Sequence, residues 1–373
     1  MIKNKIPLCK PSILQKDIKI LNDVIKSGWL AHGKYNEIFE KSFAKYIGTK
    51  YAISLNSCTS ALELALWAYD IKGDVIIPSF TWVSTANVVK LSGCNPVFVD
   101  VEINSRNLNL DKIKKKITKK TKALIVVHFG GYPIEDIELI YKFCKKNKIL
   151  LIEDSAECIG GSINGVKTGS LGIGCFSFYP AKNLTTCEGG MLTTNNKKIY
   201  KKIKALSAHG IQTSTYEREK KGSWYRNAHF YGRNFRMPNP LAALGFQQLK
   251  RRDEMNKDRN KIAKIYDKGL SNKKNIEIQV LAKGVYHSYQ MYTILIKNID
   301  KKELIKKLNK EKIMVSSHFD PPVHLQKAYY SYKKNRLPNT NYISKKIITL
   351  PMYPNMTVKD ANKVVQYILR YTK

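Results

Sequence analysis

Apolar and polar positions follow two alternating patterns between residues 50 and 195. Segments such as 59–70 and 134–148 repeat their apolar residues three and four positions apart, which is typical of amphipathic helices. Around them lie short, nearly continuous apolar runs, at 51–55, 74–79, 96–101, 122–129, 149–155, 175–180 and 190–195. Buried strands that alternate with helices indicate a largely parallel sheet covered on both faces. We therefore predict an α/β domain built on a mainly parallel seven-stranded sheet.

The pattern changes after residue 200. Residues 239–270 read as one long helix with a proline in its first turn, where proline is tolerated. Beyond it the sequence predicts one strand and two helices, at 289–296, 301–311 and 358–372. We expect a large domain over residues 1–250 and a smaller α+β domain over residues 251–373.

The chain is strongly basic. It has 373 residues and a formal net charge of +36, from 65 Lys and Arg against 29 Asp and Glu. Such an excess is common in proteins that bind nucleic acid, but here it is mostly lysine and is spread along predicted solvent-facing helix surfaces. Arginine, the usual reader of base edges, is sparse. We therefore expect no specific nucleic-acid binding. A basic field would instead attract a small anionic substrate.

The cysteines and the apolar runs bear on the compartment. The seven cysteines are odd in number and no two have C-x-x-C spacing, so the sequence predicts reduced thiols, no disulfide framework and no metal site. No apolar run reaches the roughly 18–20 residues that cross a bilayer, and the first residues lack the apolar stretch of a secretion signal. We expect a cytoplasmic protein without a membrane partner.

Three polar segments lie where predicted strands end, the usual place for sites in parallel sheets. Ser57 and Thr59 open the helix after the first strand, where hydroxyls and free N–H groups make either an anion site or an ordinary helix cap. Glu153 and Asp154 are either a solvated pair or include a partner for a cationic ring nitrogen. Lys182 precedes a glycine pair, and a partly desolvated lysine can attack a carbonyl. In so basic a chain, however, one lysine alone indicates little.

The neighbours of Lys182 carry a specific resemblance. Asp154 with Ala156, followed by S-F-x-x-x-K-N-L-T-T-x-E-G-G-M over residues 177–191, resembles the sugar aminotransferases of the DegT/DnrJ/EryC1/StrS family. The resemblance spans most of the chain, with further matching segments at 6–8, 28–30, 78–87, 96–101, 232–245 and 318–326. These relatives are fold-type I pyridoxal-phosphate enzymes. The resemblance therefore implies the aspartate-aminotransferase-like fold and pyridoxal 5′-phosphate as cofactor.

The resemblance also implies roles for individual residues. Lys182 matches the lysine that holds the cofactor as a Schiff base, and Asp154 matches the carboxylate that pairs with the pyridine nitrogen. Trp82 matches the aromatic residue that stacks on the cofactor ring, with a plain core tryptophan as the alternative. Asn234 matches an asparagine that reaches the phosphate from the neighbouring subunit, which implies a homodimer with shared active sites. The remaining cofactor contacts implied are Ser57, Cys58, Thr59, Glu157 and Ser177.

The sequence departs from the family pattern at three of its site positions. Cys58 stands where many relatives have glycine, and Tyr179 replaces a common histidine. Glu157 stands where many have Gln or His, and a glutamate there is typical of perosamine-synthase-like members. Substrate contacts are expected from Trp29, Tyr179, His318 and His324. Four further residues are weaker candidates, each with a core or surface role as the alternative: His128, Tyr225, His229 and His287.

The expected reaction moves an amino group from L-glutamate to a nucleotide-linked 4-keto-6-deoxyhexose, giving a 4-amino-4,6-dideoxy sugar nucleotide. Such products serve deoxyamino sugar and lipopolysaccharide O-antigen biosynthesis. The T-T-x-E-G-G-M ending resembles members that act at C4. Three alternatives remain: a C3-acting aminotransferase, a sugar dehydratase of the same family, in which histidine replaces the lysine, and a non-catalytic basic protein that binds nucleic acid.

Overall fold

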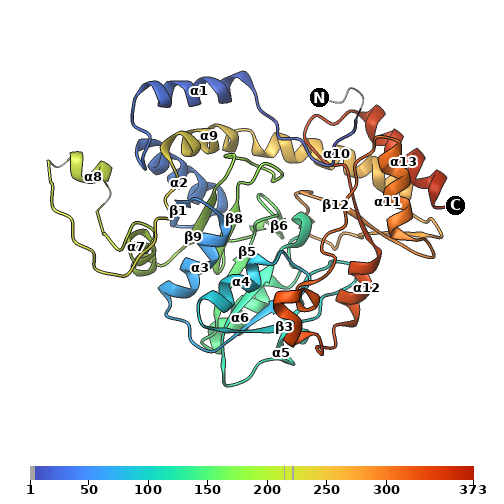
Figure 1. Ribbon diagram of the computed structural model, residues 1–373, viewed down its shortest axis with the longest axis horizontal. Helices are drawn as coiled ribbons and strands as arrows, with labels where there is room; N and C mark the ends of the chain where they lie inside the picture. The colour runs from blue at the N-terminus through green and yellow to red at the C-terminus, as the bar shows by residue number, and fades with distance from the viewer. Residues whose placement is uncertain (1–4, 214, 221) are drawn as a thin grey trace.

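The computed structural model describes residues 5–213, 215–220 and 222–373. Its centre is a seven-stranded sheet (Figure 1). The strands, in spatial order, are β1 (Tyr51–Leu55), β9 (Gly190–Thr194), β8 (Ile173–Ser177), β5 (Leu150–Asp154), β4 (Thr121–Val127), β2 (Asp74–Pro78) and β3 (Asn95–Val99). Only β9 runs against its neighbours within this sheet. The predicted seven-stranded, mainly parallel α/β fold is confirmed.

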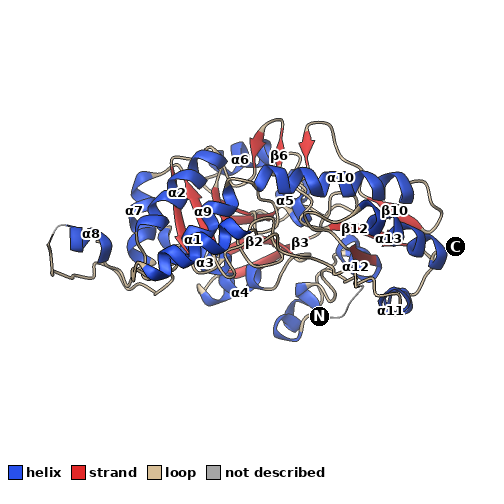
Figure 2. Cartoon of the chain, turned by 90° about the horizontal axis from the view of Figure 1, so that it is seen from above, coloured by secondary structure: helices blue, strands red, loops and turns tan. Residues whose placement is uncertain are grey.

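Helices cover both faces of this sheet, as Figure 2 shows with α4 and α6 on opposite sides. One apolar core joins the sheet to α3 (Cys58–Ala68), α4 (Ser84–Leu91) and α7 (Lys197–Leu206). On the other face, α5 (Leu110–Lys114) and α6 (Ile137–Lys146) pack in a second core, and α2 (Lys34–Ile47) and α9 (Asn239–Leu249) in a third. Burial on both faces explains why the strands read as nearly continuous apolar runs.

A separate core lies in the C-terminal part of the chain. It packs helices against an antiparallel three-stranded sheet of β10 (Ile276–Ile278), β12 (Tyr292–Ile296) and β13 (Ile347–Leu350). The helices of this part are α10 (Arg252–Leu270), α11 (Lys301–Lys310), α12 (Pro338–Lys346) and α13 (Val358–Tyr371). A small third sheet joins β6 (Ser162–Ile163) and β7 (Val166–Lys167) to β11 (Val285–Tyr286).

The single long helix predicted over 239–270 is wrong, because the structure has two helices there. α9 ends at Leu249, and Arg251 leaves helical geometry with φ −118° and ψ 12°. The buried Arg251 guanidinium pairs with Asp17 of α1 (Gln15–Lys26), with 2.5 Å between Nη2 and Oδ2. The break lets α9 pack on the large sheet and α10 on the C-terminal core. We propose that it divides the two domains.

α8 (Thr215–Lys220) lies well away from the large sheet, on a segment that extends outward on the left of Figure 1. Within the described ranges, none of the helices combines the length and the apolar character that crossing a bilayer requires.

Candidate active site

A cavity of about 480 Å³ opens where the parallel strands end. Its wall includes residues that follow β1, β2, β5 and β8, together with Gln290 and His318 of the C-terminal part. Such a position is the usual one for a ligand in a parallel sheet, and the volume suits a small-molecule site. Most of the residues singled out from the sequence line it: Ser57, Cys58, Thr59, Trp82, Asp154, Glu157, Ser177, Tyr179, Lys182 and His318.

The start of α3 forms one end of this wall. Ser57 is the N-cap, and its Oγ accepts a hydrogen bond from the Ser60 N–H at 3.0 Å, so the ordinary cap role is present. The first N–H groups of a helix have no acceptor within the helix, so they and the helix dipole can also bind an anion. Gly190 packs so closely here that a Cβ atom would lie 2.3 Å from the Ser57 carbonyl carbon. The glycine is therefore required for the backbone approach.

Cys58 occupies the helix start where many relatives have glycine. Its side chain is buried and points toward Asp154, with 3.9 Å between Sγ and Oδ1. Burial, followed by the charge of Asp154, raises the pKa of the Cys58 thiol well above its ordinary value. The thiol is therefore protonated and acts as a weak donor to the carboxylate.

Asp154 ends β5 and is buried, so the alternative of a solvated acidic pair is wrong. Its Oδ2 accepts the Thr85 hydroxyl at 2.9 Å, and its Oδ1 accepts the Ala156 N–H at 3.2 Å. Burial raises the pKa of Asp154 above its ordinary value; Glu157 adds to the rise, while Thr85, Ala156 and Lys182 oppose it. A cation placed in the cavity would restore the charged form.

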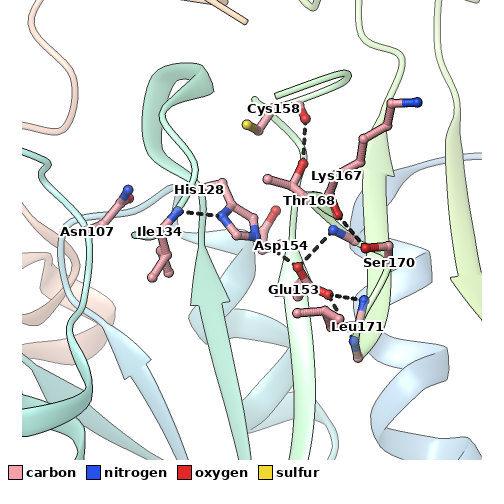
Figure 3. A network of polar contacts seen from close by, with 12 residues as sticks. Asn107, His128, Ile134, Glu153, Asp154, Cys158, Lys167, Thr168, Ser170 and Leu171 are labelled. Carbon is pink, nitrogen blue, oxygen red and sulfur yellow. Dashed lines mark hydrogen bonds and ion pairs between the residues drawn. The ribbon is translucent and has the colours of Figure 1, made fainter. Parts of the chain in front are cut away.

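Glu153, its neighbour, is enclosed in a separate network (Figure 3). Its Oε1 accepts the N–H groups of Leu171 and Gly172, and its Oε2 accepts the Gly169 N–H and lies 3.2 Å from His128 Nε2. The Ile134 N–H donates to His128 Nδ1, so the imidazole proton sits on Nε2 and points to Glu153. The hydrogen bonds of Glu153 and His128 are thus made within the protein, where they stabilise the fold.

Lys182 follows β8 in a loop that faces the cavity. Its Nζ lies 3.3 Å from Glu157 Oε1, and the other oxygen of Glu157 accepts the Gly130 N–H at 2.9 Å. The Lys182 side chain is 16% exposed. This places a single, partly enclosed amine between Glu157 and the open part of the cavity, within the described residues that line it.

Aromatic and imidazole groups form the rim. Trp82 is 63% exposed and Tyr179 is 50% exposed, so the alternative of a core tryptophan is wrong for Trp82. His318 Nδ1 lies 2.8 Å from the Thr349 hydroxyl, and burial lowers the pKa of this imidazole. A neutral imidazole at the rim can donate to or accept from a polar ligand.

Three predicted site residues lie outside the cavity lining of this single chain. His324 is fully buried with Nδ1 2.7 Å from the Ser79 hydroxyl, so its position does not support a substrate contact. Trp29 donates from Nε1 to the His32 carbonyl, and its ring packs against Tyr216. Asn234 is exposed and accepts a hydrogen bond from Arg236 Nε at 3.0 Å.

The weaker candidates do not line the cavity either. His287 is buried against Tyr289, with 3.9 Å between ring centroids, and burial lowers its pKa to about 3. Tyr225 and His229 are exposed and do not line the cavity. Conversely, the sequence analysis missed two residues that belong to the site, Thr85 and Gln290. Thr85 bonds Asp154, and Gln290 donates to the Ala181 carbonyl beside Lys182. The signal for Thr85 was available, since it lies three residues after Trp82 in a matching segment.

The residues present fit pyridoxal phosphate. Asp154 is a buried carboxyl group on the cavity wall, and its pKa is raised. A nearby cation would stabilise its ionised form, and a protonated pyridine nitrogen is such a cation. The α3 start offers N–H groups and hydroxyls to a phosphate. Lys182 offers the only lysine amine among the described cavity residues.

Comparison with known proteins agrees with this geometry. The sequence matches the DegT/DnrJ/EryC1/StrS aminotransferase family over residues 11–369. It is similar to the spore coat polysaccharide biosynthesis protein SpsC of Bacillus subtilis, at 35% identity over 97% of this chain and 96% of SpsC. The structure is similar to Helicobacter pylori PseC, an aminotransferase involved in the biosynthesis of pseudoaminic acid, with a TM-score of 0.92, 26% identity and 99% of each chain covered.

A second solved structure is similar to the same extent. It is a Streptococcus pneumoniae protein, described as a sugar aminotransferase and solved in its PLP form. The TM-score is 0.91 at 26% identity, over 99% of this chain and 98% of that one. The family match covers nearly all of the sequence, and the site has the parts that such an enzyme needs. The chain belongs to the DegT/DnrJ/EryC1/StrS aminotransferase family.

Proposed function

We propose that this enzyme moves an amino group from L-glutamate to a nucleotide-linked 4-keto-6-deoxyhexose and releases the 4-amino-4,6-dideoxy sugar nucleotide. As a member of this family it is a pyridoxal-phosphate-dependent aminotransferase, and a keto sugar is its acceptor class. The observation that carries the assignment is the convergence of Lys182, Asp154 and the α3 start on one cavity.

Each residue has a part in the proposed exchange. Bound pyridoxal phosphate supplies an aldehyde that takes up the amino group and a ring that accepts the electron pair left when a carbon loses its proton. Lys182 holds the cofactor and, once displaced, carries that proton between carbon atoms. Glu157 orients the amine through its 3.3 Å contact. Asp154 keeps a proton on the ring nitrogen, and the α3 start binds the phosphate.

Action at C4 rests on the T-T-x-E-G-G-M ending of residues 185–191 and on Glu157. The acceptor is proposed to carry a nucleotide because the chain has a net charge of +36, and a basic field raises the local concentration of a diphosphate-linked substrate. Tyr179 and His318 at the rim are proposed substrate contacts. An O-antigen or related surface polysaccharide is the proposed destination of the product.

We further propose that the active enzyme is a homodimer. Asn234 is exposed and does not line the cavity of its own chain, as expected of a residue that completes a partner's phosphate site. Three aromatic residues that precede Asn234 are also exposed in the single chain: Trp224 at 85%, Tyr225 at 61% and Tyr231 at 102%. Asn234→Ala should weaken cofactor retention, and a mixed dimer with a Lys182→Ala chain should regain it at one site.

We also propose a cytoplasmic location. All seven cysteines lie within the described residues and are free thiols, and several are buried in the core. Free thiols are typical of proteins from a reducing compartment.

The proposal can be tested by following the cofactor's absorbance in the purified, cofactor-loaded protein. L-Glutamate should convert the aldehyde form of the cofactor to its amino form, and one 4-keto sugar nucleotide should convert it back. Recovery only with a 3-keto sugar nucleotide would assign the C3 reaction instead. No conversion by glutamate or any other amino donor would overturn the proposed function.

A further inference from the structure

A chain of two hydroxyl groups ends on Asp154. Thr81 lies just after β2, and Thr85 lies in the first turn of α4. Thr81 Oγ1 is 3.2 Å from Thr85 Oγ1, and Thr85 Oγ1 is 2.9 Å from Asp154 Oδ2. Thr85 is fully buried, so bulk water does not compete for its contact with Asp154, and Thr81, which lines the cavity, is 2% exposed.

The direction of these bonds follows from the number of protons. A hydroxyl has one proton to donate, and an ionised carboxylate can only accept. With Asp154 ionised, Thr85 must donate to it, and Thr81 must then donate to Thr85. If Asp154 took up a proton on Oδ2, Thr85 would have to turn its own proton toward Thr81. The arrangement of Thr81 and Thr85 is therefore coupled to the charge on Asp154.

We propose that Thr85, backed by Thr81, is a positioning residue that keeps Asp154 ionised and aimed at the ring nitrogen of the cofactor. This inference rests on the proposed function, since it takes Asp154 to be the partner of that nitrogen. Packing alone does not require threonine at this position of α4, because valine would fill the same volume without the hydroxyl donor.

The other groups around Asp154 do not replace this donor. Glu157 is an acid and raises the pKa of Asp154, while Lys182 lowers it from across the cavity. Cys58 and Cys175 are protonated thiols, and Cys58 Sγ is 3.9 Å away, beyond the range of a strong bond. The Ala156 N–H is a second good donor, at 3.2 Å to the other oxygen. Among the described residues, Thr85 is thus the closest neutral donor to this carboxylate.

The test compares variants of Thr85 that differ in the hydroxyl alone. Thr85→Val keeps the shape and removes the donor. Thr85→Ser and Thr85→Ala form a matched pair that shares the loss of the methyl group and differs only in the hydroxyl. Each variant is measured for pyridoxal-phosphate affinity by fluorescence titration at a series of pH values, and for the pH dependence of the glutamate half-reaction.

Removing the donor should make ionisation of Asp154 harder. Hydrogen bonds to charged groups contribute about 1.5–3 kcal/mol, which corresponds to one to two pKa units, or about 10- to 100-fold in affinity on the acid side. We therefore expect the fall in affinity at low pH to begin at higher pH in Thr85→Val and Thr85→Ala. Thr85→Ser should follow the unmodified enzyme.

A double-mutant cycle with Asp154→Asn separates this inference from the proposed function. In the Asp154→Asn background, Thr85→Val should have no further effect on the pH dependence, because the group through which it acts is gone. Equal effects of Thr85→Val in both backgrounds, or equal profiles for Thr85→Ser and Thr85→Ala, would overturn the role of Thr85. If Asp154→Asn itself left affinity and activity unchanged, the assignment of Asp154 would fail first.

Discussion

Two neighbouring carboxylates on β5 differ in how completely their bonding capacity is used. Glu153 is enclosed by four donors, three of them backbone N–H groups (Figure 3). Asp154 has two good donors and faces the cavity. The pKa shifts of the two carboxyl groups have opposite signs. Burial acts to raise the pKa of Glu153, but His128 and the N–H groups outweigh this effect and lower it. Burial raises the pKa of Asp154, because its fewer donors do not outweigh the effect.

The difference follows from the pleat of the strand. Successive side chains of a strand point to opposite faces, so Glu153 and Asp154 enter different environments although they adjoin in sequence. The loop at residues 168–172, which leads into β8, encloses the Glu153 carboxylate and leaves no room for a ligand there. The Asp154 side is open to a ligand. A structural and a functional carboxylate are thus adjacent in the sequence, and substitutions of the two should affect stability and activity separately.

The largest effect should come from Lys182→Ala on the cavity side. The variant loses the amine that binds the cofactor and carries the proton, so transamination should fall by about 10⁴-fold or more. The fold should persist, because the one ion pair that Lys182 makes within the described part of the chain is with Glu157, at the cavity. Activity is measured by the glutamate half-reaction, with circular dichroism as a check on folding. Lys197→Ala, an exposed lysine on α7, is the matched control. An active Lys182→Ala variant would remove the basis of the assignment.

Asp154→Asn should have the next largest effect. Its amide cannot hold a proton on the ring nitrogen, and loss of one preorganised charge of this kind costs about 10²–10³-fold in rate. Single-turnover kinetics with L-glutamate measure the change directly. Asp111→Asn, on an exposed part of α5, controls for the chemical change. Normal kinetics in Asp154→Asn would mean that another carboxylate of the cavity, such as Glu157, pairs with the ring.

Glu153→Gln should act on stability instead. The amide turns an N–H group toward donors that need an acceptor, and each buried donor left without a partner costs about 1–3 kcal/mol. We expect the free energy of unfolding of the unliganded protein to fall by about 3 kcal/mol in urea titrations. Glu254→Gln, exposed on α10, should change it little. Activity per folded molecule should stay close to normal; a loss as large as that of Asp154→Asn would contradict the separation.

Sequence patterns predicted the strands of the large sheet and most of the cavity residues, because both are encoded in short continuous segments of the chain. All seven strands were predicted, and the motif around Lys182 located the cavity wall. The break between α9 and α10 could not be predicted, since it depends on a pairing of Arg251 with Asp17, far away in sequence. The same applies to His324, whose burial beside Ser79 is a tertiary contact. Residue type and position on the strand did not distinguish Glu153 from Asp154, and only the family resemblance singled out Asp154, because the chain beyond them decides which carboxylate is enclosed.

The smallest effects concern the pH dependence of the unliganded protein, where the two carboxylates should act in opposite directions. The folded-state pKa of Glu153 lies below its ordinary value of 4.5, so this group contributes stability above that pH and loses it as the pH falls through the folded value. The pKa of Asp154 lies above its ordinary value of 3.8, so its contribution is present at low pH and is lost as the pH rises through the folded value.

Asp154→Asn should therefore leave the unliganded protein as stable at neutral pH as the unmodified one, or more stable by about 1 kcal/mol. Glu153→Gln should flatten the loss of stability below pH 4.5, and thermal unfolding from about pH 2 to pH 8 measures both effects. A fall in stability at neutral pH in Asp154→Asn would show that Asp154, too, is a structural carboxylate. Its use by a cofactor would then no longer explain why a buried, incompletely satisfied acid stands at the end of β5.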